Sequence, residues 1–147
     1  MHLQSEHLTL RPATADDLDD LYRIYGDPAT NTFNPAGPHA DIAYSRQVLA
    51  GWLEHIESYG YGNWAISLRA NPQRIIGFGG IRIVDYPDFT VNNLGYRFSP
   101  EAWGKGLATE FALLAIDYAF NVLKLEDVGG IGRKNHRSEE RRVGEGV

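Results

Sequence analysis

The chain has 147 residues, of which 43% are hydrophobic and 22% are charged, a balance typical of one globular domain and not of a disordered chain. It has no cysteine, which excludes disulfides, thiolate metal sites and a cysteine nucleophile. The net charge of -5 argues against nucleic acid as a partner, and no apolar run reaches the roughly 18 residues of a membrane-spanning helix. We therefore expect a cytoplasmic protein that binds neither nucleic acid nor a membrane.

Hydrophobic periodicity predicts eight elements. In chain order they are a strand at 8–12, helices at 14–26 and 41–56, strands at 64–68, 75–84 and 92–98, a helix at 107–122 and a strand at 128–132. Thr14 and Asp17 resemble a capping box, and Asp41 is the expected cap of the second helix. Hairpins mixed with helices predict an α+β fold with a mixed, mostly antiparallel central sheet flanked by helices.

Glycines mark two places where the backbone needs room. Gly77, Gly79 and Gly80 inside one predicted strand indicate either a bulge or a close backbone approach. Gly104 and Gly106 precede the last helix, where free N–H groups and the helix dipole favour phosphate. The same pattern also suits a flexible helix start.

Two common phosphate loops do not match the segment before the last helix. A P-loop needs glycine where Ser99 stands and Ser or Thr where Gly106 stands. A dinucleotide fingerprint needs a third glycine at Thr109 and a βαβ unit, and the strands here are hairpin-like. Both nucleotide-binding interpretations are therefore excluded.

Several spaced motifs resemble the Gcn5-related N-acetyltransferase (GNAT) superfamily, specifically the branch of ribosomal-protein-alanine N-acetyltransferases. They are Leu8-Thr9-Leu10-Arg11-Pro12 with Asp17, Gly62-Asn63-Trp64-Ala65-Ile66, Ile76-Gly77-Phe78-Gly79-Gly80, Leu94-Gly95-Tyr96 and Trp103-Gly104-Lys105-Gly106-Leu107-Ala108-Thr109-Glu110. The resemblance covers residues 8 to about 125 and implies the acyl-CoA N-acyltransferase fold. Trp103 stands where Arg or Gln is commoner in the family.

The resemblance implies that acetyl-coenzyme A (acetyl-CoA) is the cosubstrate. Main-chain amides of the loop would bind its pyrophosphate, and the strand before the loop would pair with its pantetheine arm. The implied cofactor-binding residues are Tyr96, Arg97, Phe98, Trp103, Gly104, Lys105, Gly106, Leu107, Ala108, Thr109 and Asn135. Lys105 is either a phosphate contact or a solvated lysine, and Trp103 is expected to anchor the loop by packing.

The general acid and base are not evident from the sequence. Relatives often carry a carboxylate just before Leu94, where this chain has Asn93. The remaining candidates are Glu101, Glu110 and Ser138. The five histidines lack metal-ligand spacing, so we expect no metal.

The missing base bears on the amine that accepts the acetyl group. At neutral pH about one α-amine in ten is unprotonated, but fewer than about one lysine in a thousand. The hypothesis is therefore an N-acetyltransferase acting on a primary amine, most specifically the α-amine of a protein or peptide N-terminus. The alternative is a non-catalytic domain of the same fold that binds coenzyme A or a partner protein. The oligomeric state is not predicted.

The end of the chain differs in composition from the rest. The fifteen residues from 133 carry five basic and three acidic side chains, whereas the preceding 132 carry nine and sixteen. Residues 137–147 lack apolar periodicity and resemble a translated sequencing adapter, so we expect an incomplete N-acetyltransferase domain at 1–136, an unstructured, non-native tail and a missing last helix and strands. On that hypothesis Ser138 is no longer a catalytic candidate.

Overall fold

The protein is described by a computed structural model that covers residues 1–32, 35–129 and 131–132. Five strands form one sheet in the order β1-β2-β3-β4-β5, and each pairs with the next in the antiparallel direction. The strands are β1 (Leu3–Gln4), β2 (Leu8–Pro12), β3 (Asn63–Leu68), β4 (Asn71–Asp85) and β5 (Thr90–Phe98). The helices are α1 (Leu18–Tyr25), α2 (Ile42–Tyr59) and α3 (Leu107–Asn121).

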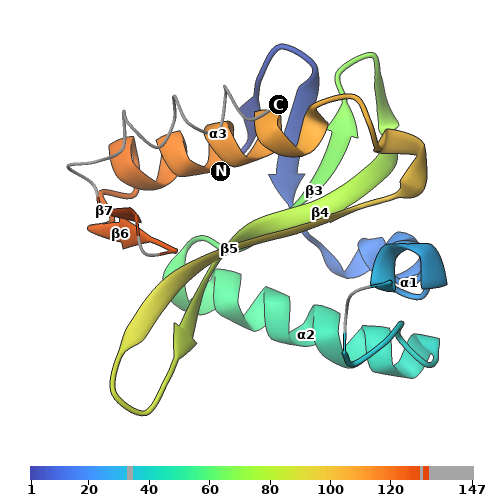
Figure 1. Cartoon of the computed structure of the whole chain (residues 1–147), viewed down its shortest axis with the longest axis horizontal. Coiled ribbons are helices and arrows are strands. Elements are labelled where there is room, and N and C mark those ends of the chain that lie inside the picture. The colour runs from blue at the N-terminus through green and yellow to red at the C-terminus, as the bar shows by residue number, and fades with distance from the viewer. Residues whose placement is uncertain (33–34, 130, 133–147) are drawn as a thin grey trace.

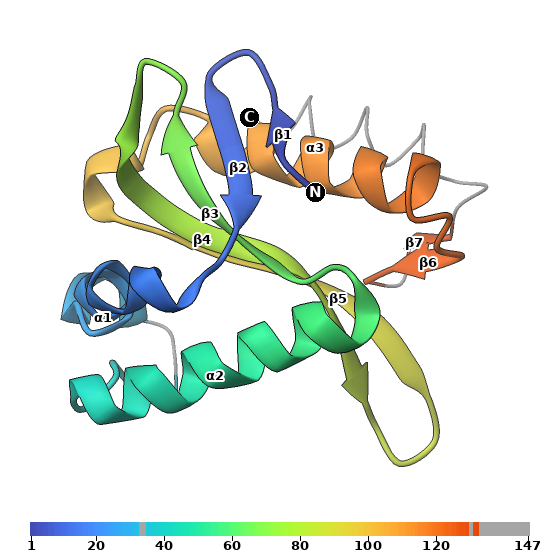
Figure 2. The same ribbon diagram turned by 180° about the vertical axis from the view of Figure 1, so that it is seen from behind.

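The sheet has helices on both faces, as Figures 1 and 2 show. Helix α3 covers one face, where Trp64 and Phe111 are fully buried in the larger core. Helices α1 and α2 cover the other face, where Phe78 packs with Leu21 and Trp52. Alternation along each strand supplies both cores, because successive side chains point to opposite faces. The predicted α+β fold, with an antiparallel sheet flanked by helices, is confirmed.

Most of the predicted elements are confirmed, and the caps explain where the helices begin. The Asp41 side chain accepts a hydrogen bond from the Tyr44 amide at 2.9 Å, so α2 starts at the expected cap. Gly60, in the left-handed conformation at φ 78°, ends it. Strand β4 begins at Asn71 and therefore includes part of the expected turn. Strand β1 was not expected, because two residues carry no periodic signal.

The predicted single strand at 128–132 is wrong. Two short strands, β6 (Asp127–Val128) and β7 (Ile131–Gly132), pair with each other as a separate two-stranded sheet. Gly129 between them adopts φ 55°, which reverses the chain. Gly129, which disfavours one long strand, therefore allows this hairpin.

The motif around Arg11 and Asp17 has a structural role. Asp17 is 2% exposed, and its two carboxylate oxygens accept hydrogen bonds from Arg11 at 2.9 and 2.6 Å. The same carboxylate accepts from the Thr14 amide at 2.8 Å and completes the predicted capping box. These bonds join the end of β2 to the start of α1.

The glycines of β4 mark a close approach at Gly79 and Gly80, and a bulge lies beside Gly77. A Cβ atom on Gly80 would lie 2.1 Å from the Gly62 carbonyl oxygen, and one on Gly79 would lie 2.7 Å from Cβ of Tyr96. Ile66 and Ser67 of β3 pair with Gly77 and Ile75, so Ile76 is the extra residue of β4. Side chains are therefore excluded at Gly79 and Gly80, and Gly80 borders the candidate site.

No helix in the described ranges is long and apolar enough to cross a membrane. The expected boundary at residue 136, together with Asn135 and Ser138, lies outside the described residues.

Candidate active site

Strand β5 has one open edge. It is the last strand of the five-stranded sheet, and among the described residues the β6–β7 hairpin is hydrogen-bonded to it only at Asn92. There the Gly129 amide donates to the Asn92 carbonyl at 2.7 Å. An edge strand presents unpaired N–H and C=O groups to a partner with main-chain-like amides. The stretch of β5 beyond Asn92 is such an edge.

The antiparallel register decides which groups of β5 face this edge. The Ser99 amide donates to the Ile76 carbonyl at 2.8 Å, and Arg97 lies opposite Phe78. Because hydrogen-bonding direction alternates along a strand, the main chain of Arg97 faces β4, and that of Tyr96 and Phe98 faces the open edge. The expectation that all three residues offer their backbone is corrected for Arg97.

The side chain of Trp103 uses one of these edge groups. Its indole Nε1 donates to the Phe98 carbonyl at 2.9 Å, while half of the Trp103 residue stays exposed. This bond, rather than the expected packing of the ring, ties the loop to the end of β5. It also leaves the Phe98 carbonyl engaged, so the Tyr96 main chain and the Phe98 amide are the available groups.

The loop before α3 presents a row of amides. Gly104 and Gly106 have φ of 75° and 73°, and Gly106 is the N-cap of α3. The Trp103 amide donates to the Pro100 carbonyl at 3.1 Å, which removes it from the expected phosphate-binding set. The next amide with a carbonyl acceptor among the described residues is that of Glu110, which donates to Gly106 at 3.1 Å. The amides from 104 to 109 are therefore open at the positive end of the helix dipole.

Two cavities follow these main-chain groups. One of ≈ 190 Å³ lies over the loop and is lined by Gly104, Gly106 and Thr109, among others. A larger one of ≈ 620 Å³ extends from Trp103 and Tyr96 to the segment after α1. Together they form a continuous run of main-chain donors and apolar walls, which suits a long ligand with a phosphate at one end.

A third cavity, of ≈ 350 Å³, lies on the α1/α2 side of β5. Its lining includes Gly80 and Gly95, which face each other across β4 and β5 and leave room where side chains would stand. Arg82 and Arg97 bring positive charge to it. Tyr96 and Arg97 line both this cavity and the large one, so the two meet at these residues.

Arg97 is held in place from the helical side. Its guanidinium donates to the Asn31 side-chain oxygen at 2.7 Å and lies 4.5 Å from the centre of the Tyr25 ring. Burial raises the pKa of Tyr25 to about 12, so its hydroxyl stays protonated at neutral pH. Burial and the charge of Arg97 lower the pKa of His39, whose ring centre lies 5.3 Å from that of Tyr25. This side of the site is therefore cationic at neutral pH, with His39 uncharged.

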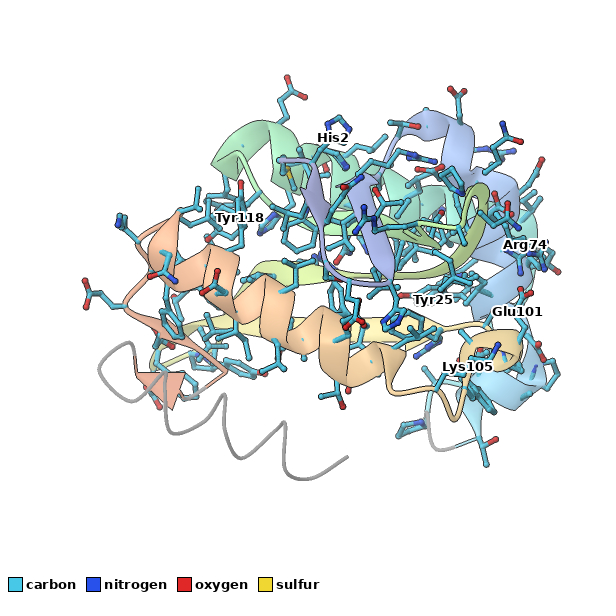
Figure 3. All side chains as sticks on the ribbon, turned by 90° about the horizontal axis from the view of Figure 1, so that it is seen from above. His2, Tyr25, Arg74, Glu101, Lys105 and Tyr118 are labelled. Carbon is cyan, nitrogen blue, oxygen red and sulfur yellow. The ribbon has the colours of Figure 1, made fainter. Side chains whose placement is uncertain are left out.

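Glu101 lies outside the cavities that border Tyr96 and Arg97. A hydrogen bond from Arg74 at 2.7 Å is the main cause that lowers the pKa of Glu101, and Arg23 lies 3.7 Å away. Arg74, Glu101 and Lys105 gather at one end of the molecule, as Figure 3 shows. A carboxylate held ionised by arginines is a poor proton donor, so the geometry assigns Glu101 a structural role.

Glu110 is bound by the N-terminal segment. Its carboxylate accepts from the Ser5 hydroxyl at 2.5 Å and the His7 amide at 2.8 Å, and it contacts the His7 ring at 2.7 Å. Burial opposes ionisation, but these hydrogen bonds outweigh it and lower the pKa of Glu110. The carboxylate joins α3 to the loop between β1 and β2. Of the three sequence candidates for catalysis, two are thus engaged elsewhere, and Ser138 lies outside the described residues.

Sequence reasoning missed the residues of the α1/α2 side. Tyr25, Asn31, His39 and Arg82 come from four separate parts of the chain, and none belongs to a motif. Two features of the sequence could have indicated them. One is the Pro- and Asn-rich segment after α1, and the other is Arg82, a cation two residues after Gly80 in β4. No group of three or more His, Cys, Asp or Glu side chains that could hold a metal ion occurs in the described part of the chain.

Comparisons with known proteins agree with this geometry. The sequence profile described as "Acetyltransferase (GNAT) domain" matches residues 7–141. An uncharacterized N-acetyltransferase, p20, of Bacillus licheniformis is 27% identical over 126 residues, which cover 86% of this chain and 70% of that protein. The crystal structure of an acetyltransferase from Agrobacterium tumefaciens is 28% identical with a TM-score of 0.73, covering 100% of this chain and 82% of that one.

More distant structures share the fold. A ribosomal-protein-S5-alanine acetyltransferase from Vibrio fischeri has a TM-score of 0.66 at 16% identity, covering 95% of this chain and 81% of that one. A spermidine N-acetyltransferase from Vibrio cholerae, in complex with CoA and spermine, has a TM-score of 0.66 at 19% identity, covering 84% and 70%. The ribosomal-protein branch is thus one of several with this fold.

Proposed function

The chain belongs to the GNAT family of acetyltransferases, and on that premise we propose that it transfers an acetyl group from acetyl-CoA to the α-amine of a protein or peptide N-terminus. The observation that carries the choice of acceptor is the pair of arginines, Arg82 and Arg97, beside the cavity opposite the cosubstrate side of β5. The cosubstrate and the acceptor would then approach β5 from different sides and meet near Tyr96.

The described residues fit the acetyl donor of the family. The amides from 104 to 109 would hold its pyrophosphate, and a Cβ at Gly104 would project into open space, so a ligand can approach the main chain there. The open groups of Tyr96 and Phe98 would pair with the amides of its pantetheine arm. When bound, acetyl-CoA supplies the activated acetyl group as a thioester. Asn135 remains part of the proposal from the family resemblance.

The arginines favour the neutral form of the acceptor amine. Transfer forms a bond between the amine nitrogen and the acetyl carbon, breaks the carbon–sulfur bond, and requires the amine to lose a proton. A nearby positive charge disfavours protonation and lowers the pKa of a bound amine. An α-amine with a pKa of about 8 then needs little further help, whereas a lysine near 10.4 must shift by more than about three units. Arg97, fixed by Asn31 and Tyr25, is the residue placed to exert this effect.

Charge also separates this site from a polyamine site. Spermidine carries several positive charges at neutral pH, and placing them beside Arg82 and Arg97 is unfavourable. The structural neighbour that acts on spermidine shares the fold only, so its substrate does not transfer. The cationic cavity supports an acceptor with a single amine.

The test is a comparison of acceptors with the full chain. We would measure thiol release from acetyl-CoA with a panel of N-terminal peptides, with the same peptides blocked at the α-amine but carrying an internal lysine, and with spermidine. The proposal predicts that free α-amines react faster by at least tenfold. Faster reaction of lysine side chains or spermidine would refute it. Calorimetry with acetyl-CoA would show separately whether the cosubstrate binds.

A further inference from the structure

Arg82 stands out among the residues of the cavity on the α1/α2 side of β5. It lies opposite Asn93 in the β4–β5 register, two residues from Gly80, so its side chain projects on the same face of the sheet as Arg97. Its Nε atom is buried and has no hydrogen-bond partner among the described residues. Arg97, by contrast, is held by Asn31 and the Tyr25 ring.

An unsatisfied buried donor on a charged group is costly. The Arg82 residue is partly exposed, but its Nε is buried, and a buried N–H that has no acceptor destabilises the protein. A guanidinium in that position is matched best by an anion. In the described part of the chain, however, no Asp or Glu lines this cavity or the neighbouring one of ≈ 290 Å³ around His39 and Tyr44. Among the described residues, the walls of these two cavities therefore supply no anion to match Arg82.

We propose that the acceptor supplies it: the substrate carries a carboxylate close to the reacting amine, and Arg82 binds that carboxylate. The inference rests on the proposed transfer to an α-amine and specifies an acceptor that carries a carboxylate beside that amine. A guanidinium can bind a carboxylate through two parallel hydrogen bonds, which fixes the orientation of the substrate as well as its charge. Asn63 and Asn93 line the same cavity and add uncharged polar groups beside it.

The carboxylate has two possible sources, which share this chemistry. It is either an Asp or Glu side chain at the first or second position of a peptide N-terminus, or the α-carboxylate of a free amino acid. Both place an anion within a few bonds of the amine. A polyamine has no such group and is rejected by both arginines.

The experiment compares matched acceptors that differ only in the negative charge. The pairs are peptides that begin Asp against Asn, peptides that begin Ser-Asp against Ser-Asn, and a free amino acid against its amide. We expect at least a tenfold higher kcat/KM for the acid member of one pair, and the pair that shows it identifies the source. Equal rates within twofold in all pairs would overturn the inference.

Variants show whether Arg82 is responsible. Arg82→Met should reduce the preference to below twofold through KM, leave acetyl-CoA affinity unchanged, and not lower the thermal midpoint, because an unpaired buried donor is removed. Arg82→Lys should retain part of the preference. Arg46→Met, at an exposed position of α2, is the matched control and should change nothing. A preference that survives in Arg82→Met would overturn the assignment.

The outcome also separates this inference from the proposed function. If α-amines are refused and lysine side chains accepted, the proposed function fails, and the charge comparison is made with lysines flanked by Asp or Asn. A charge preference there would still support the role of Arg82. If α-amines react irrespective of charge, only the inference fails.

Discussion

The two sides of β5 present different chemical groups to the site. On the edge and toward α3 the site consists of main-chain groups from one continuous stretch, residues 96–109. On the α1/α2 side it consists of side chains from α1, the following loop, α2, β4 and β5. A main-chain site needs only the right turns and glycines, whereas a side-chain site needs the fold to bring distant residues together. This difference explains why the proposed cosubstrate side is visible as a motif and the proposed acceptor side is not.

The largest expected effect is the loss of acetyl-CoA affinity when the loop amides before α3 are displaced. Gly106→Val places a β-branched residue at φ 73° and should move the amides of the loop. We expect at least a hundredfold loss of acetyl-CoA affinity, about 2.7 kcal/mol, by titration calorimetry. Gly60→Val introduces the same strain at φ 78°, at the end of α2, and is the matched control. Equal losses of affinity in both variants would contradict the comparison.

The buried Asp17 carboxylate should contribute to the stability of the fold and not to the choice of acceptor. Asp17→Asn removes a buried carboxylate from Arg11 and from the Thr14 amide, and we expect a loss of about 2 kcal/mol in the free energy of unfolding. The control is Asp20→Asn, whose partly exposed pair with Arg23 should contribute less than about 1 kcal/mol. Denaturant unfolding measures both. If folded Asp17→Asn protein had a changed acceptor preference, the purely structural role of Asp17 would be contradicted.

Filling the proposed acceptor cavity should weaken acceptor binding and leave acetyl-CoA binding unchanged. A Cβ on Gly95 would meet only the Asn93 side-chain nitrogen, at 3.7 Å, so Gly95→Val adds volume beside Gly80 without backbone strain. We expect about a tenfold rise in the acceptor KM, about 1.4 kcal/mol, with acetyl-CoA affinity within twofold. Gly51→Val, at an open position of α2, is the volume control. A lower affinity for acetyl-CoA with an unchanged acceptor KM would reverse the assignment of the two sides.

The smallest effect is expected at Glu110, which lies in the first turn of α3 but belongs to neither side of the site. Hydrogen bonding to Glu110 raises the pKa of His7, so the stabilisation from His7 is present below 6.5 and lost as the pH rises through its raised value. The lowered pKa of Glu110 gives stabilisation above 4.5 that is lost as the pH falls. The thermal midpoint of Glu110→Gln should therefore lie furthest below that of the parent between pH 4.5 and 6.5.

Activity separates this structural role of Glu110 from a catalytic one. The kcat of folded Glu110→Gln protein should stay within twofold of the parent, because the carboxylate contacts Ser5 and His7 rather than the cavities at β5. A loss of a hundredfold or more would restore Glu110 as a general acid or base.

The limits of sequence reasoning follow from the same contrast. The caps at Thr14, Asp17 and Asp41 are local, so the helices could be predicted to within a few residues. The loop at Gly104 and Gly106 is also evident from local sequence. The orientation of the β5 main chain is not, because only the register with β4 shows that the main chain of Arg97 faces β4.

The acceptor side depends on contacts that no local pattern encodes. Arg97 and Asn31 are 66 residues apart in the chain, and their hydrogen bond exists only because α1 and the loop after it pack beside β5. Glu101 and Glu110 show the converse limit of local patterns. Their positions suggested catalysis, but arginines and the N-terminal segment engage them through contacts that the fold creates.

The most direct test of the two-sided site is the change in main-chain amide chemical shifts of the isotope-labelled protein when acetyl-CoA is added without an acceptor. We expect the largest changes at residues 104–109 and at Tyr96 and Phe98, and little change at Asn63 or at the side-chain Nε of Arg82, which line the other cavity. Large changes at Asn63 and Arg82, with the loop amides unmoved, would contradict the two-sided site.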